Sequence, residues 1–356
     1  MRPYLRALAV LALTGGLLAF FLRSANLGHV WQEMRGGDPG WLLLSFVCTS
    51  ATYLLRSARW RLLLRPLGAV RLASALQATI IGFGLSALLP ARPGEVVRPY
   101  LLARREGISA TGAFATILLE RLLDLVAVLL LLGGCLVLFG SGVRGPGSSL
   151  LRAVEVGGAV TAAAALAAFG MMFAMAGRPE FSDRTLGHVR QVLPEALGRA
   201  VARLAGRFTV GLGVVRQLRG FAEALGWSLA NWLVVALSVW TVALAYRLSI
   251  PFSGSFIMLA LLVVGMAVPT PGSIGGFHAA FQIGATTLYA VPPDRAAAAA
   301  IVLHAMAFVP VAAVSMVLMA REGLNLAAVR RLASSDARSG NGALGKGGAT
   351  QQGSSP

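Results

Sequence analysis

Long apolar runs recur along nearly the whole chain, and short polar segments rich in arginine separate them. A helix needs about 20 apolar residues to cross the hydrocarbon core of a bilayer, and many of these runs approach or exceed that length. The pattern predicts an all-α polytopic membrane protein with about six full spans and two interrupted segments. The full spans are 5–22, 41–55, 112–140, 151–176, 221–246 and 296–320, and the interrupted segments are 73–103 and 254–290.

The two interrupted segments break at Pro and Gly: residues 88–95 read LLPARPGE, and residues 269–276 read PTPGSIGG. A bilayer core has no water to satisfy a free N–H or C=O, so a broken helix at membrane depth must lie inside protein or beside a polar cavity. Paired breaks in the two halves of a chain are the best sequence pointer to a transport site. We therefore expect the two breaks to meet at one site.

Charge is scarce and strongly basic. Only 13% of the residues are charged, about half the share of a typical soluble domain, and the mean hydropathy is +0.74. The net charge of +17 does not indicate a nucleic-acid partner, because the arginines lie between apolar runs and no soluble basic domain is present. The two cysteines lie in apolar runs without metal-ligand spacing, so we expect no metal and no other cofactor.

The distribution of arginine predicts the orientation, since cytoplasmic loops carry an excess of Lys and Arg. Of the 31 basic residues, 22 lie in the segments 56–71, 178–220 and 321–346, near the N-terminus, or at 104–105. The other connectors hold only five. We therefore expect both termini on the cytoplasmic side. The segment 5–22 is too long for a signal-peptide core and is expected to be a retained span.

The same count constrains the interrupted segments. Each must enter and leave the membrane on one side, either as a re-entrant hairpin or as a pair of short spans. The arm 94–103 is about 15 Å long as a helix, too short for a core of roughly 30 Å, which favours hairpins. The first hairpin would enter from the cytoplasm and the second from outside, which is the order of an inverted-topology repeat.

Three regions follow from this organisation. Residues 1–322 are expected to form the transmembrane domain. Within it, residues 178–220 mix arginine with apolar residues at helical spacing, which indicates a cytoplasmic amphipathic connector near the headgroups or a simply solvated one. Residues 323–356 are expected to be a cytoplasmic and mostly disordered tail, because Ser, Gly and Gln dominate its end.

The strongest candidate site is a group of charges in and beside the first break. Charged residues at membrane depth are costly, so they indicate pathways by default. Arg92, Glu95 and Arg98 are spaced by three residues, so on a helix Glu95 can pair with both arginines. The two carboxylates of the next span, Glu120 and Asp124, are four residues apart and need a cation between them. A hairpin arginine or Arg121 could supply it. These candidates are Arg92, Glu95, Arg98, Glu120, Arg121 and Asp124.

Two interpretations of this group stay open. It is either an ion-pair network that fixes the hairpin to the span, or a binding site in which Arg92 or Arg98 holds a lipid phosphate through the planar fork of its guanidinium. The second break carries no charge. Its backbone N–H groups either face an anion or close a tight turn packed in protein. The candidates there are Gly272, Ser273, Gly275 and Gly276.

Structural roles could explain several further polar residues as well as functional roles could. His278 and His304 lie in apolar segments and are either neutral side chains bonded to a neighbouring helix or proton-coupling groups. Residues 56–61 read RSARWR and are typical of anchors at the inner membrane boundary, with recruitment of anionic lipid headgroups as a weaker alternative.

Four motifs occur in a fixed order: ARWRLL at 58–63, LPARPGE at 89–95, ERLLD at 120–124 and PTPGSIGGF at 269–277. Together they resemble the lysylphosphatidylglycerol synthase transmembrane-region family of flippase-like integral membrane proteins, over residues 5–322. The resemblance implies a bacterial or archaeal inner-membrane protein similar to the flippase half of the multiple peptide resistance factor. That half is associated with moving aminoacylated phosphatidylglycerol, and other relatives are linked to polyprenyl-phosphate sugars.

Two departures from the family pattern limit what it implies. The aminoacyltransferase domain that follows the membrane region in that factor is expected to be absent, and with it the synthase activity. The family commonly has an acidic residue shortly after the second Pro-Gly motif, where this chain has Phe277 and His278.

Three functions remain open from the sequence. The first is a flippase or transporter for an anionic or aminoacylated phospholipid or a polyprenyl-phosphate sugar. The second is a membrane enzyme of lipid-linked sugar or phospholipid modification, in which Glu120 and Asp124 would serve as acid–base groups. The third is a non-catalytic partner that recruits a separate synthase or glycosyltransferase chain. We expect transport more than catalysis.

Overall fold

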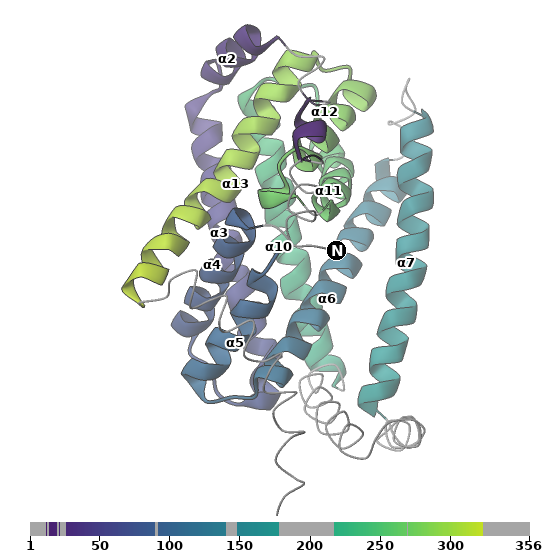
Figure 1. The fold of residues 1–356 in the computed structure, drawn as a ribbon. Coiled ribbons are helices and arrows are strands. Elements are labelled where there is room, and N and C mark those ends of the chain that lie inside the picture. Colours follow the sequence, from purple (N-terminus) through teal and green to yellow (C-terminus); the bar gives the residue numbers. More distant parts are fainter. Residues whose placement is uncertain are drawn as a thin grey trace, which may run out of the picture.

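The computed structural model describes residues 12, 14–19, 21, 26–89, 92–139, 148–177, 217–268 and 270–322. Every regular element in this part of the chain is helical, and most of the helices run along a common long axis (Figure 1). The all-α prediction is therefore confirmed for the described residues. The predicted connector 178–220 lies outside them except for its last four residues, and the predicted tail 323–356 lies outside them altogether.

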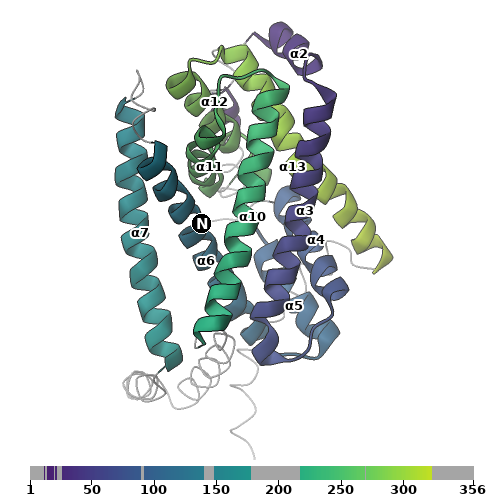
Figure 2. The same ribbon diagram turned by 180° about the vertical axis from the view of Figure 1, so that it is seen from behind.

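After the helical residues 14–19 and 21, the first half of the bundle continues with a short helix that was not predicted from the sequence. Asn26 caps it by accepting backbone N–H groups, and Asp38 caps the next helix in the same way, with Pro39 at the first helical position. The last helix of this half lies at the edge of the bundle beside its predecessor (Figure 2). The helices are α2 (Leu27–Arg35), α3 (Pro39–Leu63), α4 (Leu72–Leu88), α5 (Gly94–Glu106), α6 (Ala110–Phe139) and α7 (Ser148–Gly177).

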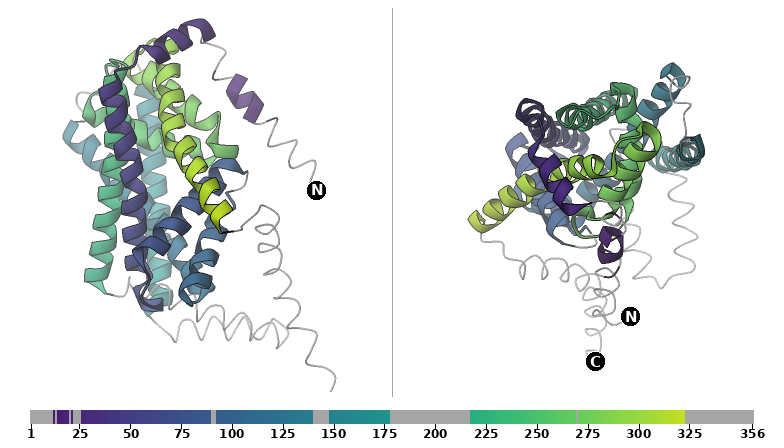
Figure 3. Two further views of the ribbon diagram at one scale, coloured as in Figure 1. Left: turned by 90° about the vertical axis from the view of Figure 1, so that its left-hand side faces the viewer. Right: turned by 90° about the horizontal axis from the view of Figure 1, so that it is seen from above.

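The second half follows the same order of a long helix, two short helices and a long helix. Its last helix is inclined across the others (Figure 3). The helices are α10 (Leu218–Ala245), α11 (Phe252–Ala267), α12 (Gly276–Tyr289) and α13 (Pro293–Arg321), with the short 3₁₀ turn η4 (Pro271–Ser273) between α11 and α12.

Four described helices are long and apolar enough to cross a membrane, namely α3, α6, α10 and α13. Each matches a predicted span within a few residues, except that α3 continues eight residues beyond the predicted end at residue 55. The prediction of six full spans stays a prediction, because most of the segment 5–22 is not described and α7 is not among the four.

Each interrupted segment forms two helices that pack against each other in opposite directions. α5 returns along α4, and the Arg105 Nη1 atom donates to Gln77 Oε1 at 2.8 Å. Glycine makes the close approach possible: a Cβ atom on Gly94 would overlap the Gly82 carbonyl group, and a Cβ atom on Gly276 would overlap the Gly265 carbonyl group. In both hairpins the first residue of the returning helix is therefore a glycine packed on a glycine of the preceding helix.

The two hairpins approach from opposite ends of the bundle and meet (Figure 1). η4 packs against α4, where Gly272 contacts the Ala87 carbonyl oxygen, and the Arg92 guanidinium donates to the Met266 carbonyl oxygen near the end of α11. The remaining packing is reciprocal: α3 packs on α10, α4 on α13, and α11 on α6. Each hairpin is thus held by the closing helix of the other half.

Ion pairs join helices at both ends of the bundle. At one end they connect the segment before α4 to α10 and to α5, and they connect α5 to the end of α13. At the other end they connect α2 to the start of α13. Most of these side chains are at least partly exposed, so each pair contributes less than about 1 kcal/mol. The pairs are Arg65–Glu223, Arg71–Glu106 and Arg105–Glu322 at the first end, and Glu33–Arg295 and His29–Asp294 at the second.

Candidate functional site

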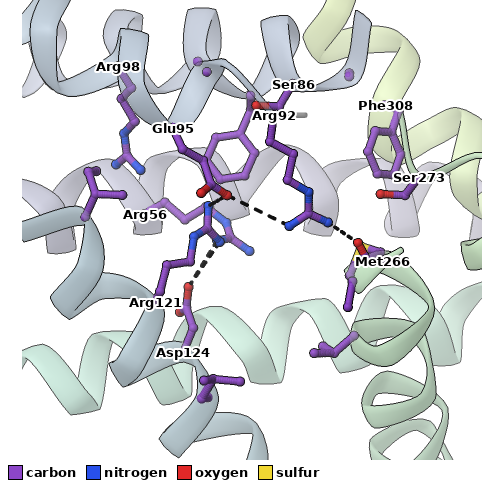
Figure 4. A pocket seen from close by; sticks show the side chains of 18 of the residues that line it. Arg56, Ser86, Arg92, Glu95, Arg98, Arg121, Asp124, Met266, Ser273 and Phe308 are labelled. Atoms are coloured by element: carbon purple, nitrogen blue, oxygen red, sulfur yellow. Dashed lines mark hydrogen bonds and ion pairs between the residues drawn. The ribbon is translucent and has the colours of Figure 1, made fainter. Parts of the chain in front are cut away.

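A cavity of about 340 Å³ lies where the two hairpins meet (Figure 4). Residues of α3, α4, α5, α6, α10, α11, η4 and α13 line it. Arg92, at the first break, and Ser273, at the second, both line the cavity, and both are non-glycine residues with positive φ, of 49° and 57°. Such backbone conformations are costly and cluster at functional sites. The breaks therefore shape a shared cavity between the two halves.

A buried ion-pair network lies at one wall of this cavity, which Arg56, Arg98 and Asp124 of the network line. Arg59 on α3 lies between the two carboxylates of α6: its Nη2 atom is 3.1 Å from Glu120 Oε1, and its Nη1 atom is 2.5 Å from Asp124 Oδ1. The Arg59 and Glu120 side chains are fully buried. Ser228 accepts a further hydrogen bond from Arg59, and Trp232 Nε1 donates to Asp124 Oδ1 at 2.8 Å. Buried charges require this kind of pairing, so the network fixes α3, α6 and α10 to one another.

Aromatic rings hold two further arginines of the network. The Arg98 guanidinium lies 3.9 Å from the centre of the Trp60 ring, and its Nη1 atom donates to Glu120 Oε1 at 3.0 Å. The Arg56 guanidinium lies 5.1 Å from the Phe83 ring and 5.5 Å from the Trp232 ring, with Asp124 Oδ2 at 3.8 Å. These cation–π contacts stabilise both charges in a site that is nearly closed to solvent.

Three charged side chains are more open and face the cavity (Figure 4). The side chains of Arg92, Arg121 and Glu95 are 41%, 37% and 36% exposed. Arg121 Nη2 is 3.2 Å from Glu95 Oε1, whereas Arg92 Nη1 is 4.0 Å from the same oxygen. Arg92 and Arg121 are therefore the arginines best placed to meet a ligand, while Arg59 and Arg98 support the wall behind them.

The balance of charge around the cavity is positive. In the described part of the chain, five arginines and three carboxylates form this site, which leaves two positive charges in excess. The rest of the lining is largely apolar and includes Ile117, Leu125, Val128, Val263 and Phe308. Such a combination suits an anionic group attached to an apolar chain.

The structure changes two details predicted from the sequence. Glu95 pairs with Arg92 and Arg121, not with Arg98, because Arg98 turns to Glu120. The cation that contacts both Glu120 and Asp124 is Arg59 of α3. The predicted hairpin arginine contacts one of them, since Arg98 pairs with Glu120, while Arg121 only approaches Asp124 to 4.0 Å.

The interpretation of residues 56–61 as boundary anchors is wrong for Arg59 and Trp60, which are both fully buried. Sequence reasoning missed Arg56, Arg59 and Trp232 as members of the site. The signal was present: Arg56 and Arg59 share one face of an apolar helix, where an unpaired charge would be costly.

The second break contributes little of its surface to the cavity. Ser273 lines it, but Gly272, Gly275 and Gly276 do not. The Gly275 N–H donates to His278 Nδ1 at 3.4 Å, and the Gly272 carbonyl oxygen lies 2.7 Å from His304 Nε2. These contacts support a packed turn, and a role of the three glycines in binding substrate stays a prediction.

The two histidines belong to an aromatic stack behind the cavity. Their ring centres are 4.6 Å apart, and Phe308 stacks on His304 at 4.3 Å while also lining the cavity. Among the described residues, no group of three or more His, Cys, Asp or Glu side chains is placed to hold a metal ion.

Known proteins resemble this chain. Glycosyltransferase AglD of Haloferax volcanii is 28% identical over 324 residues, which are 84% of this chain and 51% of that protein. The UPF0104 membrane protein MJ1595 of Methanocaldococcus jannaschii is 27% identical over 102 residues, which are 28% of this chain and 30% of that protein. The chain thus spans about half the length of the first relative, and the match covers a smaller share of the second.

The family itself is shown by the match to a family model. The sequence model of the lysylphosphatidylglycerol synthase transmembrane region matches residues 7–315, which include both hairpins and every residue of the cavity. The chain is therefore a membrane protein of the lysylphosphatidylglycerol synthase transmembrane-region family.

Proposed function

We propose that this protein is a flippase-type transporter that moves the headgroup of a phosphate-bearing lipid between the two leaflets. The observation that carries the proposal is the cavity with excess positive charge at the meeting point of the two broken segments. Arg92 and Arg121 would bind the phosphate there, since guanidinium groups bind phosphate oxygens through paired, charge-assisted hydrogen bonds.

The apolar part of the cavity lining supports a lipid as the cargo. Phe308, Val263 and Val128 line the cavity together with the arginines, and an acyl or polyprenyl chain would remain against such apolar surfaces while the headgroup crosses. Ser273 would contribute a hydroxyl group from the second hairpin, so that both halves of the protein contact the headgroup.

We also propose that the two hairpins are re-entrant and that the halves form an inverted-topology repeat. The helices α4, α5, α11 and α12 have 13 to 17 residues, which corresponds to about 20–26 Å and is shorter than a core of roughly 30 Å. The reciprocal packing of α4 on α13 and of α11 on α6, and the glycine pair in each hairpin, support the repeat.

The proposed location is the cytoplasmic membrane, crossed several times, with both termini in the cytoplasm. The excess of arginine in 56–71, 178–220 and 321–346 supports this orientation. The end of the bundle that carries Arg65, Arg71 and Arg105 would then face the cytoplasm.

A second candidate function is a membrane-embedded partner or enzyme of lipid-linked sugar or phospholipid modification. The similarity to a protein named Glycosyltransferase AglD favours it. The geometry supports the partner more than the enzyme: Glu120 is fully buried, and Asp124 lies within 4.0 Å of three arginines, so neither carboxylate is available for proton transfer. Co-purification of a separate synthase or glycosyltransferase chain would distinguish this role.

The transport proposal predicts a large effect of Arg92→Ala. Reconstituted wild-type protein is expected to move fluorescent phosphatidylglycerol or a fluorescent polyprenyl phosphate across vesicles faster than protein-free membranes do, measured by dithionite quenching with and without a proton gradient. Arg92→Ala should reduce that rate at least about tenfold, because a charge-assisted contact to phosphate is lost. The fold should persist, since the side chain is 41% exposed.

Arg104→Ala is the matched control, because Arg104 lies on the same hairpin helix, is exposed and does not line the cavity. It should transport like the wild type. Wild-type vesicles that move neither lipid under any condition would overturn the transport proposal. An unchanged rate in Arg92→Ala at normal expression would remove Arg92 from the mechanism.

A further inference from the structure

The charges around the cavity also determine which class of headgroup it accepts, an inference that rests on the proposed function. Each carboxylate of the site is already close to at least two guanidinium groups. Glu95 lies within 4.0 Å of Arg92 and Arg121, and Glu120 within 3.1 Å of Arg59 and Arg98. Asp124 lies within 4.0 Å of Arg56, Arg59 and Arg121.

An ammonium group that approached any of these carboxylates would therefore also approach two or more arginines. At such distances the repulsion between like charges is strong in a site that is partly closed to water. The second hairpin offers no compensation, because the segment after its break has Phe277 and His278 where an acidic residue would be needed, and Ser273 is neutral. Among the described residues, the cavity thus has a surplus of cationic donors, and each carboxylate that lines it is already close to two or more arginines.

We propose that the cavity binds a lipid whose headgroup carries a phosphate ester and no amine, and that it rejects aminoacylated lipids. A polyprenyl phosphate, its ester with a neutral sugar, and unmodified phosphatidylglycerol all have this chemistry. Lysylphosphatidylglycerol does not, since its two ammonium groups outweigh its single phosphate. The two excess positive charges of the site match a phosphate ester and oppose the aminoacyl group.

Phosphatidylglycerol and lysylphosphatidylglycerol form a matched pair of probes, because they differ only in the lysyl group. The full-length protein in phosphatidylcholine nanodiscs would be titrated with each lipid, and with undecaprenyl phosphate, and binding would be counted by native mass spectrometry. Phosphatidylglycerol and undecaprenyl phosphate are expected to bind at least about tenfold more tightly than lysylphosphatidylglycerol. Inorganic phosphate should fail to displace them at equal concentration, because it lacks the apolar chain.

A charge-reversal variant tests whether the site causes the preference. Arg121→Glu removes the excess positive charge, so the ratio between the two glycerol lipids should fall severalfold toward one. Arg104→Glu makes the same change of total charge on an exposed helix position outside the cavity and should keep the wild-type ratio. The comparison of lipids on the wild-type protein does not depend on how well either variant folds.

The outcomes separate the two proposals. Equal or tighter binding of lysylphosphatidylglycerol by the wild-type protein would overturn the inference and leave the transport proposal standing. Binding of no phosphate-bearing lipid above the phosphatidylcholine background would overturn both. Displacement by inorganic phosphate at equal concentration would overturn the assignment to a lipid and indicate a soluble phosphate ligand.

Discussion

Replacing Arg59 by Ala is expected to destabilise the protein by about 3–5 kcal/mol, because it leaves buried carboxylates without their main cation. Arg59 contacts both Glu120 and Asp124, and its side chain is fully buried, so water cannot take its place. Its loss should also loosen the contact between α3 and α6. In detergent the melting temperature should fall by about 10 °C.

The two cysteines provide a direct measurement of this effect. Cys48 and Cys135 are buried and free, so a thiol-reactive fluorescent dye labels them only when the protein unfolds. Arg59→Lys should give an intermediate melting temperature, since an ammonium group cannot satisfy both carboxylates at once. Arg61→Ala is the control, because Arg61 lies on the same helix and is exposed. A melting temperature of Arg59→Ala within about 2 °C of the wild type would contradict the structural role assigned to this residue.

Replacing Gly94 by Ala is expected to cost about 3 kcal/mol, the upper part of the range for overpacked positions. The added Cβ atom would overlap the Gly82 carbonyl group, which belongs to the backbone and cannot rotate away. α5 would then have to move away from α4, and the position of Arg98 against Trp60 and Glu120 would change with it. The thiol-labelling melt described for Arg59 also measures this loss.

Two further glycine variants sharpen the test of Gly94. Gly276→Ala makes the equivalent change in the second hairpin and should destabilise to a similar extent, because its Cβ atom would overlap the Gly265 carbonyl group. Gly133→Ala is the control, since nothing lies within 4 Å of a Cβ atom there and alanine favours the helical conformation of α6. If Gly94→Ala melts like Gly133→Ala, the close approach of α4 and α5 is not required for stability.

Much of the fold could be predicted from the sequence, because the bilayer fixes how long an apolar run must be to cross it. The predicted ends of α6, α7, α10 and α13 agree with the structure within a few residues. The end of α3 was missed for a physical reason: Arg56 and Arg59 resemble a membrane boundary until their carboxylate partner is known. That partner, Asp124, lies more than sixty residues further along the chain, and no local pattern connects them.

In the candidate site, too, some features could be predicted from the sequence and others could not. Charged residues inside apolar segments stand out in a sequence, and the candidates found in this way were Arg92, Glu95, Arg98, Glu120, Arg121 and Asp124. Their pairing was not identified, because each guanidinium had several carboxylates within reach and only the three-dimensional packing selects among them. The aromatic rings that hold Arg56 and Arg98 come from three helices, and an aromatic residue in an apolar helix gives no sign of facing a charge.

The hydrogen bond from Arg92 to the Met266 carbonyl oxygen has a consequence for how quickly a ligand can leave. In the structure, the Arg92 guanidinium donates to a carbonyl group at the end of α11. A phosphate bound by Arg92 as proposed would compete with that carbonyl group, and the carbonyl group would accept the arginine again as the phosphate departs. For the proposed transporter this competition would keep the affinity for phosphate moderate and its exchange rapid, as a protein that passes its cargo onward requires.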